Sequence, residues 1–268
     1  EFYGAEVSYF SGKVRAYLRY KRIPFSEITP SREIYRTIIM ARVGWPVIPV
    51  VVTPEDETWQ DSSEIIDNFE ARFPEGDIYP EGAKQKLAAL LIEAYADEWL
   101  KIPAMHYRWN FDDMNLDFIM AEFALNMPQS MSGEQADEMF MKSSGRMRKA
   151  ATVFGVSPES QPFIESAFEE WLDLFSAHLA DYPYLLGGQP TLGDYRLIAA
   201  MWDHLYRDAA PSLLIKRRAP RVGRWVERIA TGEPYVHEYG GVDDPTLFDD
   251  SDRPETLLAM MRFVAEEY

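Results

Sequence analysis

The chain has 268 residues, of which 47% are hydrophobic and 14% aromatic, so it has enough core-forming material for one large domain or two modest ones. Its formal net charge of −17 argues against a nucleic-acid partner, since phosphate contacts need clustered Lys and Arg side chains. The absence of cysteine excludes disulfides, thiolate metal sites and thiol nucleophiles, and four scattered histidines disfavour any metal site.

The first 75 residues alternate short strand-like and helix-like segments, separated by turn residues. In chain order the pattern predicts a strand at 1–7, a helix at 12–22, a strand at 23–30, a helix at 31–41, strands at 47–52 and 57–60, and a helix from 62 that ends before Pro74. This β-α-β-α-β-β-α order predicts a small α/β domain over residues 1–75.

Strand-like segments disappear after a short linker rich in Pro and Gly, at residues 76–82. The predicted helices cover 84–109 with a kink at Pro103, then 132–155, 162–181, 191–208 and 219–232. The last stretch holds an acidic loop and one short helix. Residues 83–268 are therefore predicted to form an all-helical domain.

Two prolines stand beside the third predicted strand, at positions 46 and 49. Proline cannot donate to a sheet ladder, so its presence here needs a reason, and a cis Ile48–Pro49 peptide bond is one candidate. After the fourth strand, Asp61 and Ser62 open a helix whose free N–H groups and dipole attract an anion. Plain capping by Ser62 is the alternative reading of the same residues.

This arrangement resembles the glutathione transferase superfamily, and the resemblance extends to about residue 230. It implies a thioredoxin-like first domain, an all-α second domain and glutathione as the bound cofactor. Ile48 would pair with the cysteinyl part of glutathione through its backbone, beside the family's cis-proline at Pro49. Asp61 and Ser62, usually Glu-Ser in the family, would hold the γ-glutamyl end. A further match is the Ser/Thr-x-x-Asp capping box, which here starts at Thr191 and is structural.

Superfamily members activate the glutathione thiol with a hydroxyl or hold a cysteine at the end of the first strand. The segment aligns without gaps to the serine-type pattern, in which the key residue lies seven positions before Arg15 and seventeen before Phe25, which gives Ser8. Its hydroxyl would donate to the sulfur, favour the thiolate and lower a thiol pKa of about 8.5. The dipole of the helix that follows would add to this effect.

The sequence departs from that pattern because Tyr9, not proline, follows Ser8. Tyr9 resembles the hydroxyl donor of tyrosine-type members, although its distance to the second strand is then about five residues too short. Ser11 is a third candidate, and a site without a catalytic hydroxyl is a fourth. The missing cysteine excludes the thiol-exchange and dehydroascorbate-reducing branches of the superfamily.

A candidate substrate pocket lies at the end of the long predicted helix, where His106, Tyr107, Arg108 and Trp109 follow one another. Two aromatic rings, an imidazole and a guanidinium would form a hydrophobic wall with polar groups. The alternative is an aromatic core cluster with an ion pair at the domain interface.

The resemblance implies a glutathione transferase that attacks a small hydrophobic electrophile with the bound thiolate, and that forms a homodimer. Two alternatives share the fold: a binding or scaffold protein without turnover, and a glutathione-dependent lyase, etherase or isomerase. No apolar run approaches the roughly 18 residues of a membrane span and no signal peptide is visible, so a cytoplasmic protein without a membrane partner is expected.

Overall fold

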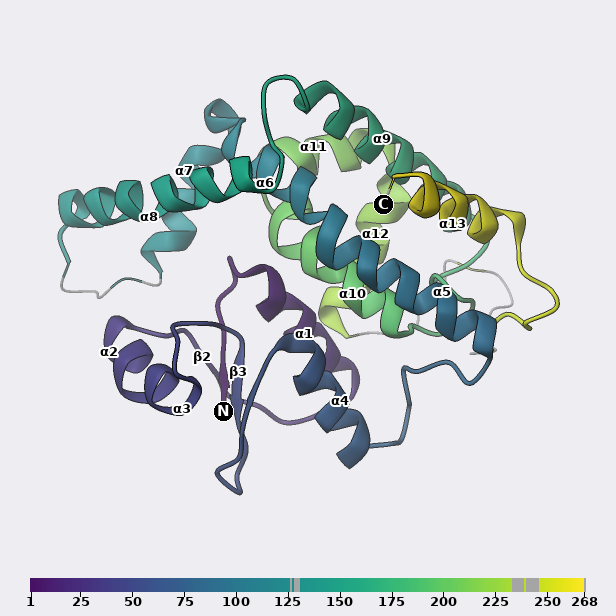
Figure 1. The fold of residues 1–268 in the computed structure, drawn as a ribbon, viewed down its shortest axis with the longest axis horizontal. Helices are drawn as coiled ribbons and strands as arrows, with labels where there is room; N and C mark the ends of the chain where they lie inside the picture. Colours follow the sequence, from purple (N-terminus) through teal and green to yellow (C-terminus); the bar gives the residue numbers. More distant parts are fainter. Residues whose placement is uncertain (126, 128–130, 233–238, 240–245, 268) are drawn as a thin grey trace.

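The computed structural model describes residues 1–125, 127, 131–232, 239 and 246–267, and it joins a small α/β part to a larger helical part (Figure 1). The elements of the α/β part are β1 (Phe2–Tyr3), α1 (Tyr9–Tyr20), β2 (Glu27–Ile28), α2 (Arg32–Ile34), η1 (Tyr35–Ile39), α3 (Met40–Val43), β3 (Val50–Val52), β4 (Thr58–Gln60) and α4 (Ser62–Arg72). The predicted β-α-β-α-β-β-α order is confirmed, and η1 is a π-helical stretch inside the second helix.

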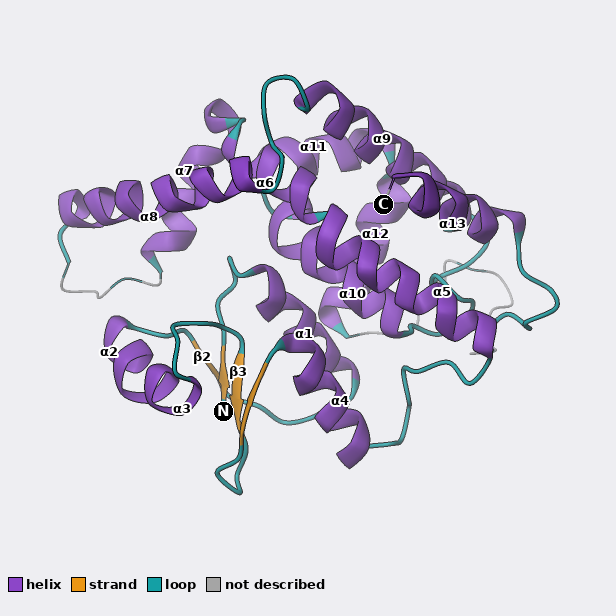
Figure 2. Ribbon diagram, viewed as in Figure 1, coloured by secondary structure: helices purple, strands orange, loops and turns teal. Residues whose placement is uncertain are grey.

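The four strands form one mixed sheet in the order β2-β1-β3-β4. β1 runs parallel to β2 and antiparallel to β3, which is antiparallel to β4. Because successive strand residues point to opposite faces, the sheet separates two cores. Phe2, Val51 and Trp59 pack in the core that includes α1 and α4, whereas Tyr3 and Val50 pack against α2, η1 and α3. Figure 2 shows the strands between these two layers of helices.

The first two strands are shorter than the sequence pattern suggests. β1 ends at Tyr3, and β2 is limited to Glu27–Ile28, where Pro24 has already removed one donor from the predicted segment. The first helix begins at Tyr9, three residues earlier than predicted. The Ile48–Pro49 peptide bond is cis.

The helical part starts after the 73–82 connection. Its elements are α5 (Ala83–Ala94), η2 (Tyr95–Trp99), α6 (Lys101–Trp109), α7 (Asp112–Ala124), α8 (Gly133–Val153), α9 (Gln161–His178), α10 (Leu192–Ala200), η3 (Met201–Tyr206), α11 (Ala209–Arg218), α12 (Pro220–Thr231) and α13 (Glu255–Glu267). Of the last predicted stretch, residues 233–238 and 240–245, including part of the acidic loop, lie outside the described residues.

The long helix predicted over 84–109 is divided into α5, η2 and α6. The interruption is the π-helical η2, and Pro103 lies in the first turn of α6, where its missing N–H is tolerated. A third π-helical segment, η3, continues α10. Both segments approach the first helix: the Tyr9 hydroxyl donates to the Ala96 carbonyl of η2 at 2.6 Å, and the Tyr9 ring meets the His204 ring of η3 at 5.5 Å.

One apolar core continues from the α/β part into the helical part. Tyr17 and Leu18 of α1 belong to it together with residues of α5, α9, α10 and α12. The Tyr17 and Tyr195 rings make an edge-to-face contact at 6.0 Å across the boundary. Asp194, which belongs to the predicted capping box, accepts from the Thr191 N–H at 2.9 Å and from the Trp225 indole at 3.0 Å.

Candidate functional site

Three predicted site segments meet at one end of the sheet, because of the strand register. Tyr3 pairs with Val50, and Val50 pairs with Gln60. The end of β1, the start of β3 and the end of β4 therefore lie in one row. The loop to Ser8, the Ile48–Pro49 peptide and the start of α4 all leave the sheet from this row, which we call the site edge.

Ser8 occupies the N-cap position of α1 and is half-buried. Its side chain makes no capping hydrogen bond, and no described residue pairs with its hydroxyl. The Tyr9 hydroxyl, by contrast, is committed to Ala96, and burial raises the pKa of Tyr9 well above its ordinary value. Ser11 is fully buried and accepts the Ala5 N–H at 3.3 Å. Of the three candidate hydroxyls, only that of Ser8 is uncommitted.

The two predicted glutathione-binding segments have unusual backbones. No described backbone group pairs with the N–H or the carbonyl of Ile48, which precedes the buried Pro49. Asp61 has φ +75° and ψ 127°, a region that non-glycine residues rarely adopt. Its exposed carboxylate caps α4 by accepting the N–H groups of Ser63 at 2.8 Å and Glu64 at 3.4 Å. Ser62 is buried, and no described residue pairs with its hydroxyl.

A pair of buried cations beside α4 was missed by sequence reasoning. Lys13 of α1 lies 3.5 Å from the Ser63 hydroxyl, which also accepts from the Arg196 guanidinium of α10. Both side chains are almost fully buried. Their acidic neighbours are Asp97, 3.7 Å from Lys13, and Glu93, 3.0 Å from Arg196. Burial, followed by the charge of Arg196, lowers the pKa of Lys13 to about 8. We call these five residues the Lys13 cluster.

Most of the predicted substrate-pocket residues lie inside the helical part. His106 is buried and its Nε2 lies 2.9 Å from the Glu165 carboxylate of α9. Tyr107 packs in the main core against Phe168, and Trp109 belongs to a separate cluster formed by α6, α7 and α8. None of the three contacts Ser8 among the described interactions, so the structure does not gather them into a wall at the site edge.

Arg108 differs from its neighbours because it reaches the α/β part. Its guanidinium pairs with Asp208 through two hydrogen bonds of 2.7 and 2.9 Å, and it donates to the Asp203 carbonyl at 2.6 Å. It also donates to the carbonyl of Val7, directly before Ser8, at 3.3 Å. The placement of these residues matches the alternative of an aromatic core with an ion pair at the domain interface.

Comparison with known families gives a match in each of the two parts of the chain. The family model described as glutathione S-transferase, N-terminal domain, matches residues 2–77. The model described as glutathione S-transferase, C-terminal domain, matches residues 148–228. The chain belongs to the glutathione S-transferase superfamily. A comparison with curated protein sequences gives no match.

Solved structures with the same fold cover nearly all of this transferase-family chain. A glutathione S-transferase from Rhodospirillum rubrum F11 is 17% identical, with a TM-score of 0.52, and the alignment covers 91% of this chain and 99% of that one. The beta-etherase LigF from Sphingobium sp. strain SYK-6 is 18% identical, with a TM-score of 0.58 and coverages of 87% and 96%. Glutathione transferase GSTFuA3 from Phanerochaete chrysosporium is 13% identical, with a TM-score of 0.58 and coverages of 88% and 97%. At these identities the likeness concerns the fold.

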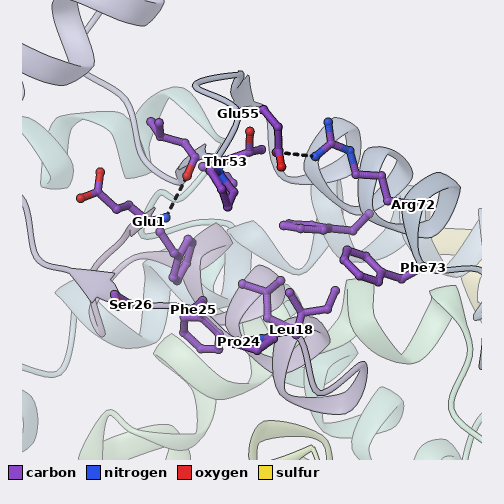
Figure 3. A pocket seen from close by; sticks show the side chains of 15 residues that line it. Glu1, Leu18, Pro24, Phe25, Ser26, Thr53, Glu55, Arg72 and Phe73 are labelled. Carbon is purple, nitrogen blue, oxygen red and sulfur yellow. Dashed lines mark hydrogen bonds and ion pairs between the residues drawn. The ribbon is translucent and has the colours of Figure 1, made fainter.

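A cavity of about 540 Å³ lies at the other end of the sheet from the site edge (Figure 3). It is lined by Glu1, by the end of β3 with Thr53, and by Phe73 after α4. None of the candidate hydroxyls and none of the predicted glutathione-binding residues belongs to its lining. In this member of the glutathione S-transferase superfamily, this cavity and the predicted chemistry therefore lie at opposite ends of the sheet.

The described part of the chain contains no group of three or more His, Asp or Glu side chains arranged to hold a metal ion. Within the same residues, none of the helices combines the length and the apolar character that crossing a membrane requires.

Proposed function

We propose that the chain binds glutathione at the site edge and that the Ser8 hydroxyl stabilises the thiolate, which then attacks a small hydrophobic electrophile. The observation that carries this proposal is the uncommitted Ser8 hydroxyl at the N-terminus of α1, because the loop to Ser8 leaves the sheet at the same edge as the Ile48–Pro49 peptide, whose Ile48 backbone groups have no described backbone partner. A hydroxyl donor and the positive end of a helix both favour a thiolate over a thiol.

The start of α4 supports the γ-glutamyl part of this proposal. An α-amino acid end carries an ammonium and a carboxylate, and this part of the site offers a partner for each. The exposed Asp61 carboxylate suits the ammonium, while the Ser62 hydroxyl, the helix N-terminus and the buried cations Lys13 and Arg196 suit the carboxylate. Asp61→Asn should weaken binding through the lost partner of the amino group.

The test of Ser8 uses the thiolate absorbance of bound glutathione, titrated with pH. Ser8→Ala should leave glutathione binding nearly intact and raise the pKa of the bound thiol toward the free value of about 8.5. Turnover at pH 7 should fall by about one to three orders of magnitude. Tyr9→Phe is the control, because a tyrosine-type site predicts the opposite ranking of the two variants. If neither substitution moves the thiol pKa, activation by a hydroxyl is wrong and the non-catalytic binding function gains weight.

Transfer, ether cleavage and isomerisation would all start from the same thiolate, so the reaction type needs its own assay. Retention on glutathione-agarose separates a glutathione binder from a scaffold without a ligand. Conjugation of generic electrophiles then separates a transferase from a binding protein, and release of a phenol from an aryl ether indicates an etherase.

We also propose a homodimer, as the family resemblance implies. Leu87, Leu90 and Leu91 form an exposed apolar stripe on α5, with exposures of 57%, 42% and 40%. These positions lie on one face of the helix and suit burial against a second copy. Light scattering should give twice the chain mass, and Leu90→Glu should shift it toward the monomer. A monomeric mass for the unmodified chain would contradict this proposal.

A further inference from the structure

The N-terminus of α1 leaves its own N-cap serine unused. An N-cap serine normally accepts, through its side chain, the N–H of the second or third helical residue. Ser8 has the extended backbone of an N-cap residue, with φ −95° and ψ 118°, but its hydroxyl makes no such bond. The donor it would otherwise accept, the Ser11 N–H, instead donates to the Ser8 carbonyl at 3.0 Å.

A carboxylate from the helical part explains this arrangement. Asp203 of η3 accepts the Gly12 N–H through Oδ2 at 3.0 Å, whereas the same N–H lies 3.4 Å from the Ser8 carbonyl. The Gly12 N–H would normally form the first i→i−4 hydrogen bond of α1, and here it bonds mainly to the Asp203 carboxylate. The Ser8 carbonyl is then left to the Ser11 N–H, so the Ser8 hydroxyl is not engaged by the third helical residue.

Gly12 is what lets the carboxylate come this close. A Cβ at position 12 would lie 2.1 Å from Asp203 Oδ2 and 2.7 Å from its Cγ, far inside any real contact. A glycine inside a helix costs about 1 kcal/mol relative to alanine, so its presence here has a packing reason. The backbone of α1 and the buried carboxylate are fitted to each other across the boundary between the two parts.

The main chain of Asp203 holds the other side of Ser8. Its carbonyl accepts from Arg108 at 2.6 Å, and Arg108 donates to the Val7 carbonyl at 3.3 Å while Asp208 fixes the guanidinium. Asp203 is therefore linked through Arg108 to Val7, the residue before Ser8. Its carboxylate also bonds directly to Gly12, four residues after Ser8. Asp203 is 1% exposed, so both contacts lie within the core.

We propose that Asp203 is a positioning residue that caps α1 in place of Ser8 and so leaves the Ser8 hydroxyl available to the glutathione sulfur. Gly12 leaves the space that the Asp203 carboxylate occupies. This inference rests on the function proposed above for Ser8. It adds a requirement for a buried carboxylate from the helical part, which the motifs of the α/β part do not contain.

The experiment compares Asp203→Ala and Gly12→Ala with Asp203→Asn in the full chain. Asp203→Ala removes the acceptor, and Gly12→Ala displaces it while keeping the carboxylate. In both, the Ser8 hydroxyl should turn back to the helix, and the pKa of bound glutathione should rise toward that of the Ser8→Ala variant. Turnover at pH 7 should fall about tenfold, with recovery at higher pH. Asp203→Asn keeps an acceptor oxygen for the Gly12 N–H, so the pKa of bound glutathione should not rise in this variant.

The direction of the shift makes the test decisive, because removing a negative charge near a thiol would by itself lower the thiol pKa. A lowered pKa in Asp203→Ala, or an equal rise in Asp203→Asn, would overturn the capping role. An unchanged pKa in both Asp203→Ala and Gly12→Ala, while Ser8→Ala raises it, would overturn it as well.

A readout without glutathione separates this inference from the proposed function. Amide hydrogen exchange at Gly12 should accelerate in Asp203→Ala and stay slow in Asp203→Asn, whatever the chain binds. If glutathione fails to bind at all, the proposed function fails, and the exchange data still decide whether Asp203 caps α1. Equal protection of Gly12 in all variants would show that Asp203 does not cap the helix.

Discussion

Two buried cations, Arg108 and Lys13, differ in how closely they approach their acidic partners. The Arg108 guanidinium makes three short hydrogen bonds, two of 2.7 and 2.9 Å to Asp208 and one of 2.6 Å to the Asp203 carbonyl. In the Lys13 cluster, the ammonium lies 3.5 Å from the Ser63 hydroxyl and 3.7 Å from Asp97. Both cations are buried, but only one has a close, geometrically matched partner.

The difference indicates different roles for the two clusters. A buried charge with well-placed partners holds a structure together, and its loss leaves an uncompensated charge behind. A buried charge with distant partners is costly in the folded state, as the pKa of about 8 for Lys13 shows, because burial disfavours its charged form. Such costs concentrate at binding sites. We therefore interpret the Arg108 cluster as structural and the Lys13 cluster as part of the proposed γ-glutamyl pocket.

The largest effect is expected for Arg108→Met. The substitution leaves the fully buried Asp208 without its cation, so the free energy of unfolding should fall by about 3–5 kcal/mol in urea titrations. Burial already raises the pKa of Asp208, so the unpaired carboxyl should take up a proton, and the deficit should narrow as the pH is lowered.

Arg218→Ala is the matched control for this prediction. Arg218 also makes two-pronged contacts with carboxylates, at 2.6 to 2.8 Å from Glu169 and Asp173, but it is exposed. Its loss should change the free energy of unfolding by less than about 1 kcal/mol. Equal losses in the two variants would remove the distinction between a structural and a superficial ion pair.

The second prediction concerns Lys13→Met. At pH 7 the charged lysine destabilises the folded chain, so the variant should be as stable as the unmodified protein or more stable, by up to about 3 kcal/mol. The folded chain holds fewer protons than the unfolded chain between about pH 8 and the lysine value of 10.5. Stability should therefore rise with pH in that window and fall as the pH drops toward 8, and this slope should be smaller in the variant.

Glutathione binding should change in the opposite direction to stability. Calorimetry should show roughly tenfold weaker binding by Lys13→Met, about 1.4 kcal/mol, because the γ-glutamyl carboxylate loses a cation. A variant that is clearly less stable at pH 7 and binds glutathione normally would place Lys13 with the structural cluster instead.

Sequence reasoning reached most of the α/β part because its signals are local. The strand order, the Ile48–Pro49 segment and the helix start at Asp61 each depend on a few neighbouring residues, and the structure contains all three. The exact limits of β1 and β2 were not predictable, because pairing rather than propensity determines where two-residue strands end.

The interactions across the boundary between the two parts were out of reach of sequence reasoning. Lys13 and Arg196 lie far apart in the chain, and nothing local indicates that both contact Ser63. Asp203 and Gly12 likewise meet only in the folded chain. A lysine within an apolar helix face was the one available signal, because lysine is almost never fully buried unless it is paired. For the aromatic run at 106–109 the sequence leaves a substrate pocket and an aromatic core both open, since the composition of a core and that of a pocket are alike.

The third prediction compares two adjacent serines of α4. Ser63→Ala removes the hydroxyl that accepts from both Arg196 and Lys13, so unfolding should become easier by about 1–2 kcal/mol. Ser62→Ala removes a hydroxyl that pairs with none of the described residues and should leave stability nearly unchanged, yet it should weaken glutathione binding by about 1–3 kcal/mol. Urea titration measures the stability of both variants, and calorimetry measures their affinity for glutathione. Asp61, not Ser62, caps α4, so a stability loss confined to Ser62→Ala would assign Ser62 a structural role other than capping.

The smallest effect is expected for the hydroxyl that joins α1 to η2. Tyr9→Phe removes the 2.6 Å hydrogen bond to the Ala96 carbonyl, which should lower the free energy of unfolding by about 1 kcal/mol. Ser8→Ala should cost less, because no described residue pairs with the Ser8 hydroxyl. For the pKa of bound glutathione the order should reverse, with Ser8→Ala raising it and Tyr9→Phe leaving it in place. Two hydroxyls on adjacent residues would then serve different ends, one binding the two parts of the chain together and the other held free for the sulfur. A Tyr9→Phe variant that keeps full stability and loses the low thiol pKa would exchange their roles.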